Sequence, residues 1–153
     1  MTNARQRDFR IAPHVQGKRV LIVEDDQGVL ELVQTRLELA GIRTFISRNG
    51  VEGVKRAAEL RPDAIVLDIN MPLLSGFSVL AELRQSETLC AIPVLMLTSR
   101  NHMEDVRRAI ALGARNYLSK PFNDQQLVQR INRLLRPVRD RQPTSAISAA
   151  VLL

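Results

Sequence analysis

The chain has 153 residues, of which 45% are hydrophobic and 25% are charged; this balance is typical of one globular domain and unlike that of a disordered chain. No apolar run approaches the roughly 20 residues that a membrane helix needs, and residues 1–17 lack the hydrophobic segment of a secretory signal, so we expect a cytoplasmic protein without a membrane partner. The net charge of +6 is divided into +2 in residues 1–17, +3 in residues 18–136 and +1 in residues 137–153, and aromatic residues are only 3%, so we expect no direct binding of nucleic acid.

Five short apolar segments alternate with five amphipathic segments. They predict strands at 19–23, 43–46, 64–68, 93–97 and 116–119, and helices at about 28–40, 50–60, 76–85, 103–112 and 124–135. In the first helix Val29, Val33 and Leu37 recur at helical spacing, and Gly41 follows where a left-handed cap is expected. Strands that alternate with helices imply right-handed parallel crossovers. The predicted fold class is therefore α/β, a doubly wound five-stranded parallel sheet with five helices.

The two ends of the chain lack this pattern. Residues 1–17 and 138–153 contain Pro, Arg, Gln and Ser without a sustained hydrophobic period. We therefore expect a flexible basic arm at 1–17, one folded domain at 18–137 and a flexible tail at 138–153.

Polar side chains follow four of the predicted strands. Glu24 and Asp25 follow the first strand, Asp68 ends the third, and Thr98 and Lys120 follow the last two. Sites in open α/β sheets form at the carboxyl ends of the strands, so the three carboxylates should converge. Like charges about 4 Å apart repel by roughly 4 kcal/mol at an effective dielectric near 20. A cation should offset this repulsion, and hard oxygen ligands without His or Cys favour Mg²⁺; the alternative is a set of solvated acids.

Lys120 and Thr98 would complete an anion site, because they supply an ammonium group and a hydroxyl donor. A carboxylate beside a divalent ion, a lysine and a hydroxyl can attack phosphorus to form an acyl phosphate. The cations would neutralise the charge that develops on the equatorial oxygens. Asp68 is the candidate nucleophile.

Together these residues resemble the receiver domains of bacterial two-component response regulators, over about residues 18–136. Three separations agree with that family: 43 residues from Asp25 to Asp68, 30 from Asp68 to Thr98 and 22 from Thr98 to Lys120. The resemblance implies a flavodoxin-like receiver fold and the following roles: Glu24 and Asp25 as the acidic pair, Asp68 as phosphoacceptor, Asn70 as a metal ligand through its backbone carbonyl, Thr98 and Tyr117 as switch residues, and Lys120 before a cis Pro121. Asp26 is an additional acid without an assigned role.

The resemblance implies a phosphorelay receiver. A histidine kinase or phosphotransfer protein would donate a phosphoryl group to Asp68 in a Mg²⁺-dependent reaction, and binding to a downstream protein would then change. The receiver would phosphorylate itself and could dephosphorylate itself, but it would not be a turnover enzyme. Thr98 would approach the phosphoryl group and Tyr117 would rotate inward, which would alter the face formed by the fourth helix, last strand and last helix. We hypothesise that this face binds an acidic partner surface or a second receiver, through Arg107, Arg108, Arg115, Arg130 and Arg133.

Several alternatives stay open. The sequence stops 17 residues after Arg136, too soon for a helix-turn-helix unit, so we expect a stand-alone receiver similar to chemotaxis regulators. It could instead be the receiver fragment of a larger DNA-binding response regulator, with a linker that begins at Pro137. A Mg²⁺-dependent aspartyl-phosphate phosphatase usually shows Asp-x-Asp, which Asp68-Ile-Asn70 lacks. A flavodoxin-like nucleotide binder needs a Gly-rich phosphate loop, whereas acids follow the first strand here. A degenerate receiver that only binds is the remaining alternative.

Overall fold

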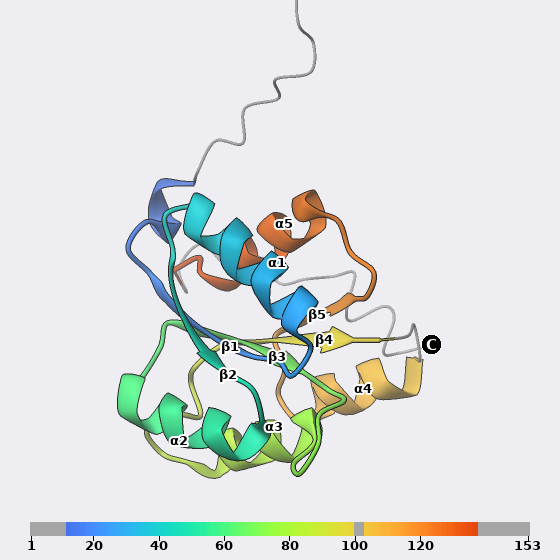
Figure 1. Cartoon of the computed structure of the whole chain (residues 1–153). Helices are drawn as coiled ribbons and strands as arrows, with labels where there is room; N and C mark the ends of the chain where they lie inside the picture. Colours follow the sequence, from blue (N-terminus) through green and yellow to red (C-terminus); the bar gives the residue numbers. More distant parts are fainter. Residues whose placement is uncertain (1–11, 100–102, 138–153) are drawn as a thin grey trace, which may run out of the picture.

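A five-stranded parallel sheet organises the part of the chain that the computed structural model describes, residues 12–99 and 103–137. The strand order is β2-β1-β3-β4-β5 (Figure 1). The strands are β1 Arg19–Val23, β2 Arg43–Ser47, β3 Ala64–Asp68, β4 Val94–Thr98 and β5 Asn116–Ser119. This arrangement confirms the predicted doubly wound α/β fold.

Among the described residues, five α-helices cover the two faces of the sheet. They are α1 Gln27–Leu39, α2 Gly50–Leu60, α3 Gly76–Gln85, α4 Met103–Ala111 and α5 Asp124–Leu134. In Figure 1, α1 and α5 lie on one side of the sheet and α2, α3 and α4 on the other. The sheet therefore has a hydrophobic core on each face.

The inner strands are apolar on both faces because each face packs against helices. Every residue of β3 and β4 is buried. In β1, Val20 and Ile22 belong to the core beneath α1 and α5, whereas Leu21 and Val23 belong to the core beneath α2 and α3. This two-sided burial is typical of parallel sheets. It leaves the carboxyl ends of the strands as the place where polar side chains gather.

The boundaries of β4 and α1 each differ by one residue from the prediction, and both differences concern polar residues near the strand ends. The strand expected at 93–97 is shifted by one residue to Val94–Thr98, since Pro93 has no N–H to donate to a sheet ladder. Thr98 is thus the last residue of β4 rather than the first residue after it. The first helix begins at Gln27 with Asp26 as its N-cap, and an Asp26 side-chain oxygen accepts a hydrogen bond from the N–H of Val29 over 2.9 Å. The additional acid therefore has a structural role.

The prediction of a flexible arm through residue 17 is wrong for residues 12–17. Pro13–Val15 form a short 3₁₀ helix, and Val15 is fully buried in the core beneath α1 and α5. His14 Nε2 donates a hydrogen bond to the carbonyl oxygen of Asn132 in α5, over 2.9 Å. The short segment lacks any periodicity, so only its tertiary contacts show that it belongs to the fold.

Residues 1–11 and the expected tail at 138–153 lie outside the described residues. None of the described helices is long and apolar enough to span a membrane.

Candidate functional site

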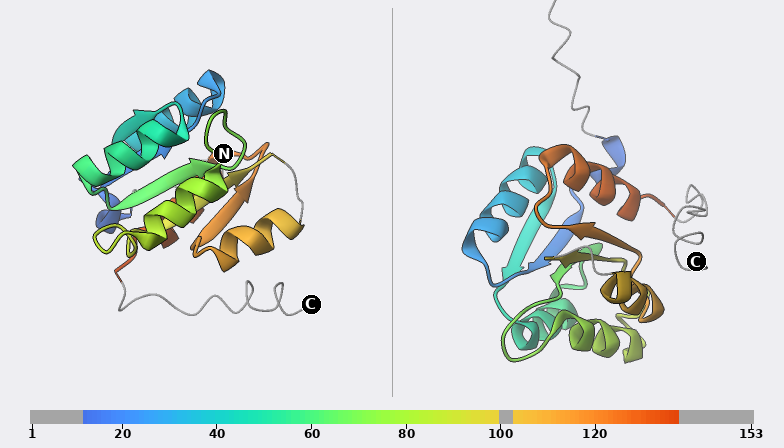
Figure 2. Two further views of the ribbon diagram at one scale, coloured as in Figure 1. Left: turned by 90° about the horizontal axis from the view of Figure 1, so that it is seen from below. Right: turned by 90° about the vertical axis from the view of Figure 1, so that its right-hand side faces the viewer.

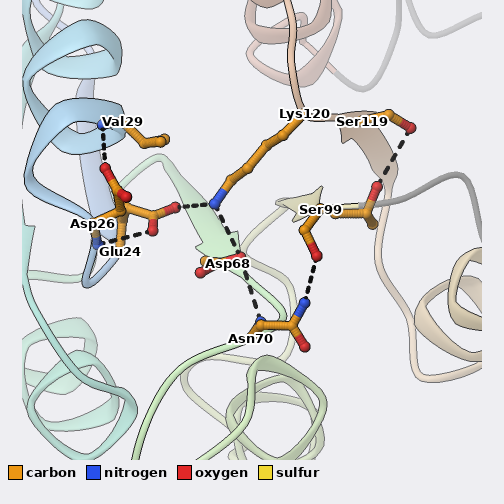
Figure 3. A network of polar contacts seen from close by, with 9 residues as sticks. Glu24, Asp26, Val29, Asp68, Asn70, Ser99, Ser119 and Lys120 are labelled. Atoms are coloured by element: carbon orange, nitrogen blue, oxygen red, sulfur yellow. Dashed lines mark hydrogen bonds and ion pairs between the residues drawn. The ribbon is translucent and has the colours of Figure 1, made fainter.

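The ends of β1, β3 and β5 meet in a buried ion-pair network (Figure 3). Lys120 Nζ lies 2.9 Å from Glu24 Oε2 and 3.3 Å from Asp68 Oδ1. Glu24 is 0% exposed and Asp68 is 2% exposed. Three residues far apart in the sequence therefore share one amine, because the parallel strands bring their carboxyl ends to the same edge of the sheet.

Glu24, Asp25 and Asp68 form a cluster that could hold a metal ion. Each offers one carboxylate oxygen, and the three oxygens lie within 4.8 Å of one another. Glu24 and Asp68 are buried, whereas Asp25 is exposed. Hard oxygen donors are the ligands that Mg²⁺ and Ca²⁺ prefer, and the exposed side leaves room for retained water. The donor set therefore fits a divalent hard cation.

The pKa values of the two buried carboxyl groups are raised, so additional positive charge beside them would favour their ionised forms. The pKa of Glu24 is raised to about 7, chiefly by burial and also by the Asp68 charge, although the hydrogen bond from Lys120 opposes both effects. Burial also raises the pKa of Asp68, against the charge of Lys120. For Lys120, burial favours a lower pKa, but the hydrogen bond to Glu24 and the charges of Asp68 and Glu24 outweigh it and raise the pKa. One ammonium group thus compensates two buried carboxylates incompletely.

Backbone and side-chain contacts hold Glu24 and Asp68 in place. Glu24 Oε1 accepts a hydrogen bond from the N–H of Asp26 over 3.1 Å, so both Glu24 oxygens have partners. Asp68 Oδ1 accepts from the N–H of Asn70 over 3.4 Å. The Asn70 carboxamide donates to Ser99 Oγ over 2.7 Å and joins the segments that follow β3 and β4 (Figure 3). Ser99 was not predicted as a site residue. Its position directly after Thr98, at the carboxyl end of β4, could have indicated that it lies at the site.

Position 76, beside the phosphoacceptor candidate Asp68, has no room for a side chain. A Cβ atom at this position would lie 2.2 Å from the carbonyl oxygen of Asp68 and 2.8 Å from the Cα of Ile69. The N–H of Gly76 also donates to the carbonyl oxygen of Ile69 over 2.8 Å. The start of α3 therefore packs directly on the end of β3, which only glycine permits.

Of the two switch candidates, Thr98 is the last residue of β4 and Tyr117 is the second residue of β5. Thr98 is buried, and its hydroxyl donates to Ser119 Oγ over 3.4 Å. Tyr117 is partly buried against the core that contains Leu21 and Val23, beneath α2 and α3. The guanidinium carbon of Arg130 lies 5.8 Å from the centre of the Tyr117 ring. The Lys120–Pro121 bond is cis, as the family resemblance predicted.

The comparison with known proteins identifies the family. The profile of the response regulator receiver domain matches residues 20–132. The chain belongs to the response regulator receiver family. It is a phosphorelay receiver domain, and its fold is the flavodoxin-like fold predicted from the sequence.

Curated relatives of this receiver are longer transcriptional regulators. It is 38% identical over 134 residues to the DNA-binding dual master transcriptional regulator RpaA of Synechocystis, which covers 88% of the receiver chain and 55% of RpaA. It is 43% identical over 122 residues to the transcriptional regulatory protein PrrA of Mycobacterium tuberculosis, covering 80% of the chain and 52% of PrrA. The chain spans about half the length of these relatives.

Solved structures of single receivers match almost completely. The Vibrio cholerae chemotaxis protein CheY4 has a TM-score of 0.74 and 31% identity, and the match covers 77% of this chain and 98% of CheY4. The receiver domain of the sensor histidine kinase PA1611 from Pseudomonas aeruginosa has a TM-score of 0.73 and 29% identity, covering 78% of this chain and 98% of that one. The PA1611 structure has a magnesium ion coordinated in its active-site cleft.

Proposed function

We propose that Asp68 accepts a phosphoryl group from a histidine kinase or phosphotransfer protein, and that the reaction depends on Mg²⁺. The observation that carries this proposal is the position of Lys120, which contacts Glu24 and Asp68 at the carboxyl ends of three strands. Glu24, Asp25, Asp68 and the backbone carbonyl of Asn70 would hold the ion. The magnesium ion in the cleft of the PA1611 receiver supports this assignment. A cytoplasmic location, expected from the sequence, is part of the same proposal.

Each site residue has a distinct part in the proposed transfer. An Asp68 carboxylate oxygen forms a bond to phosphorus while the bond from phosphorus to the donor imidazole nitrogen breaks, and the electron pair leaves with the imidazole. Bound Mg²⁺ would supply positive charge to the transferred oxygens. The ammonium group of Lys120 also neutralises negative charge on the phosphoryl oxygens. Thr98 turns its hydroxyl from Ser119 toward the new phosphoryl group. Water then hydrolyses the acyl phosphate and returns Asp68 to its free form. In this proposal the phosphorylated form is the signal, so the protein acts as a switch and not as a turnover enzyme.

A mass measurement tests this reaction. The protein is incubated with a small-molecule phosphodonor, with and without Mg²⁺, and the intact mass is read for wild type and Asp68→Asn. We expect one phosphoryl group on wild type only when Mg²⁺ is present. An equal gain in Asp68→Asn, or none in wild type, would contradict the proposal. Continued release of phosphate from phosphate esters would instead support an aspartyl-phosphate phosphatase.

The output of the switch has two candidates. We propose that phosphorylation changes a contact with a downstream protein, through the face that carries α4, β5 and α5. The second candidate is a receiver within a longer DNA-binding regulator, and the length of RpaA supports it. The mass of the native gene product separates these candidates, since an attached DNA-binding domain would add to the 17.2 kDa of this chain.

A further inference from the structure

The strand β5 lies at an open edge of the sheet and carries the switch candidate Tyr117. Among the described residues, β5 pairs with β4 alone, and α5 and α4 lie on its two sides (Figure 2, right). Leu118 belongs to the core beneath α1 and α5, whereas Tyr117 packs against the core on the other face. Successive side chains of a strand point to opposite faces, so Asn116 shares the α5 face with Leu118.

Arg130 of α5 contacts side chains on both faces of β5. Its Nη1 atom donates a hydrogen bond to Asn116 Oδ1 over 2.8 Å, on the α5 face. Its guanidinium carbon lies 5.8 Å from the centre of the Tyr117 ring, which belongs to the other face. Paired strands are only about 4.8 Å apart, so a guanidinium group cannot pass between β4 and β5. It therefore lies at the open edge of β5, on the side away from β4.

Asn116 keeps this guanidinium group beside the strand. Asn116 is only 4% exposed. Its Oδ1 atom accepts a second hydrogen bond, from the N–H of Tyr117 over 2.9 Å. A buried polar group that loses a partner is destabilised, and a hydrogen bond from a charged donor is stronger than one from a neutral donor. The bond to Asn116 therefore restricts the guanidinium group of Arg130 to a position near the Tyr117 ring.

The other switch candidate lies on the opposite side of Tyr117 from Arg130. Thr98 is the last residue of β4, and Tyr117 pairs with Met96 of the same strand. The inward rotation that the family resemblance implies would carry the Tyr117 ring toward β4 and away from the open edge. The ring would then lose its contact with Arg130. The contact thus favours the position that the ring occupies before phosphorylation.

We propose that Arg130 is a positioning residue that holds Tyr117 in its resting position until Asp68 is phosphorylated. A contact between a cation and an aromatic ring at a partly exposed site changes an equilibrium constant by about two- to fivefold. If phosphorylation breaks this contact, the contact opposes phosphorylation by the same factor, because coupling between two sites is reciprocal. This inference rests on the proposed function and adds a residue of α5 to the switch.

A double-mutant cycle in metal-free protein tests the resting contact. Urea denaturation of the full chain is measured for wild type, Arg130→Gln, Tyr117→Leu and the double variant, in the presence of a chelator. The double variant should lose less than the product of the two single losses in the folding equilibrium constant, by a factor of about two to five. Independent effects of the two substitutions would overturn the proposal. The result does not depend on any reaction at Asp68.

Beryllofluoride with Mg²⁺ tests the release of the ring, because it binds to a carboxylate as a mimic of a phosphoryl group. In isothermal titration calorimetry, Arg130→Gln should bind it about two- to fivefold more tightly than wild type. In a Tyr117→Leu background, Arg130→Gln should have no further effect. Arg43→Gln is the matched control, since it removes the same charge from an exposed side chain at the opposite edge of the sheet.

Three results would overturn the proposal: unchanged affinity in Arg130→Gln, an equal gain in Arg43→Gln, or a gain that persists without Tyr117. Absence of beryllofluoride binding in wild type, with the coupling in urea intact, would contradict the proposed function rather than the contact of Arg130.

The ring itself can be followed, because Tyr117 is the only tyrosine of the chain. Incorporation of 3-fluorotyrosine therefore places a single ¹⁹F probe, on this ring. We expect beryllofluoride with Mg²⁺ to shift the ¹⁹F resonance of wild type. An unchanged resonance in the saturated protein would show that the ring stays beside Arg130 and would overturn the proposal.

Discussion

Metal-free protein should lose stability as pH rises, because Glu24 is buried without enough positive charge. Its pKa is about 7 in the folded protein and 4.5 ordinarily, with burial as the largest cause. Between these values the folded protein holds a proton that the unfolded chain has lost. The stabilising contribution is therefore complete below the unfolded pKa and is lost as pH rises through the folded pKa. At about 1.4 kcal/mol for each pKa unit, the loss is about 3 kcal/mol. The pKa of Asp68 is raised in the same direction and adds to the effect.

Urea denaturation in the presence of a chelator, between about pH 4 and pH 8 at constant ionic strength, measures this loss. Glu24→Gln is the control, since it keeps the shape of the side chain and cannot ionise. Wild type should lose about 3 kcal/mol more than Glu24→Gln over this range. Saturating Mg²⁺ should reverse the trend in wild type, because the ion binds ionised carboxylates. Parallel pH curves for the two metal-free proteins would show that ionisation of Glu24 does not cause the loss of stability.

Three further predictions concern the packing around the site and the N-terminal segment. Gly76→Ala should destabilise the fold by about 2 kcal/mol and slow phosphorylation, because its methyl group meets the Asp68 carbonyl; unchanged urea midpoint and phosphorylation rate would contradict this. Asn70→Ala should shorten the lifetime of the Asp68 phosphate severalfold, since the hydrogen bond to Ser99 would no longer hold the two loops together. The decay of the mass gain measures this, Ser99→Ala should act in the same direction, and unaltered decay in both would disprove the role of the bond. Val15→Ala should cost about 2 kcal/mol in urea denaturation, because Val15 is fully buried; a negligible change would mean that the segment does not stabilise the fold.

The sheet and the site cluster were predictable because their signals are local. Two-sided apolar runs marked β3 and β4, and the acids and the amine at the strand ends followed directly from strand topology. Asp68 and Lys120 are 52 positions apart in the sequence, yet the parallel arrangement alone brings their side chains to one edge. The joint pattern of residues was more informative than any single residue.

The remaining features depend on tertiary contacts that no local pattern encodes. Val15 anchors residues 12–17 through one buried side chain, so the segment looked like an arm. The bond between Asn70 and Ser99 depends on how two loops approach each other. Asp26 was recognisable in principle, since an Asp before a helix is a common N-cap. Its neighbours Glu24 and Asp25 belong to the acidic cluster, so the run of three acids alone does not separate a helix cap from a metal ligand.

The proposed function requires that Asp68 itself carries the phosphoryl group. An acyl phosphate can be reduced with borohydride, which converts the modified aspartate to homoserine, and peptide mass mapping then locates the product. After treatment with a phosphodonor and Mg²⁺, we predict homoserine at position 68 of wild type, and none when Mg²⁺ is removed by a chelator. Homoserine in place of another aspartate, or a phosphorylated protein in which Asp68 is unmodified, would contradict the assignment of Asp68 as the phosphoacceptor.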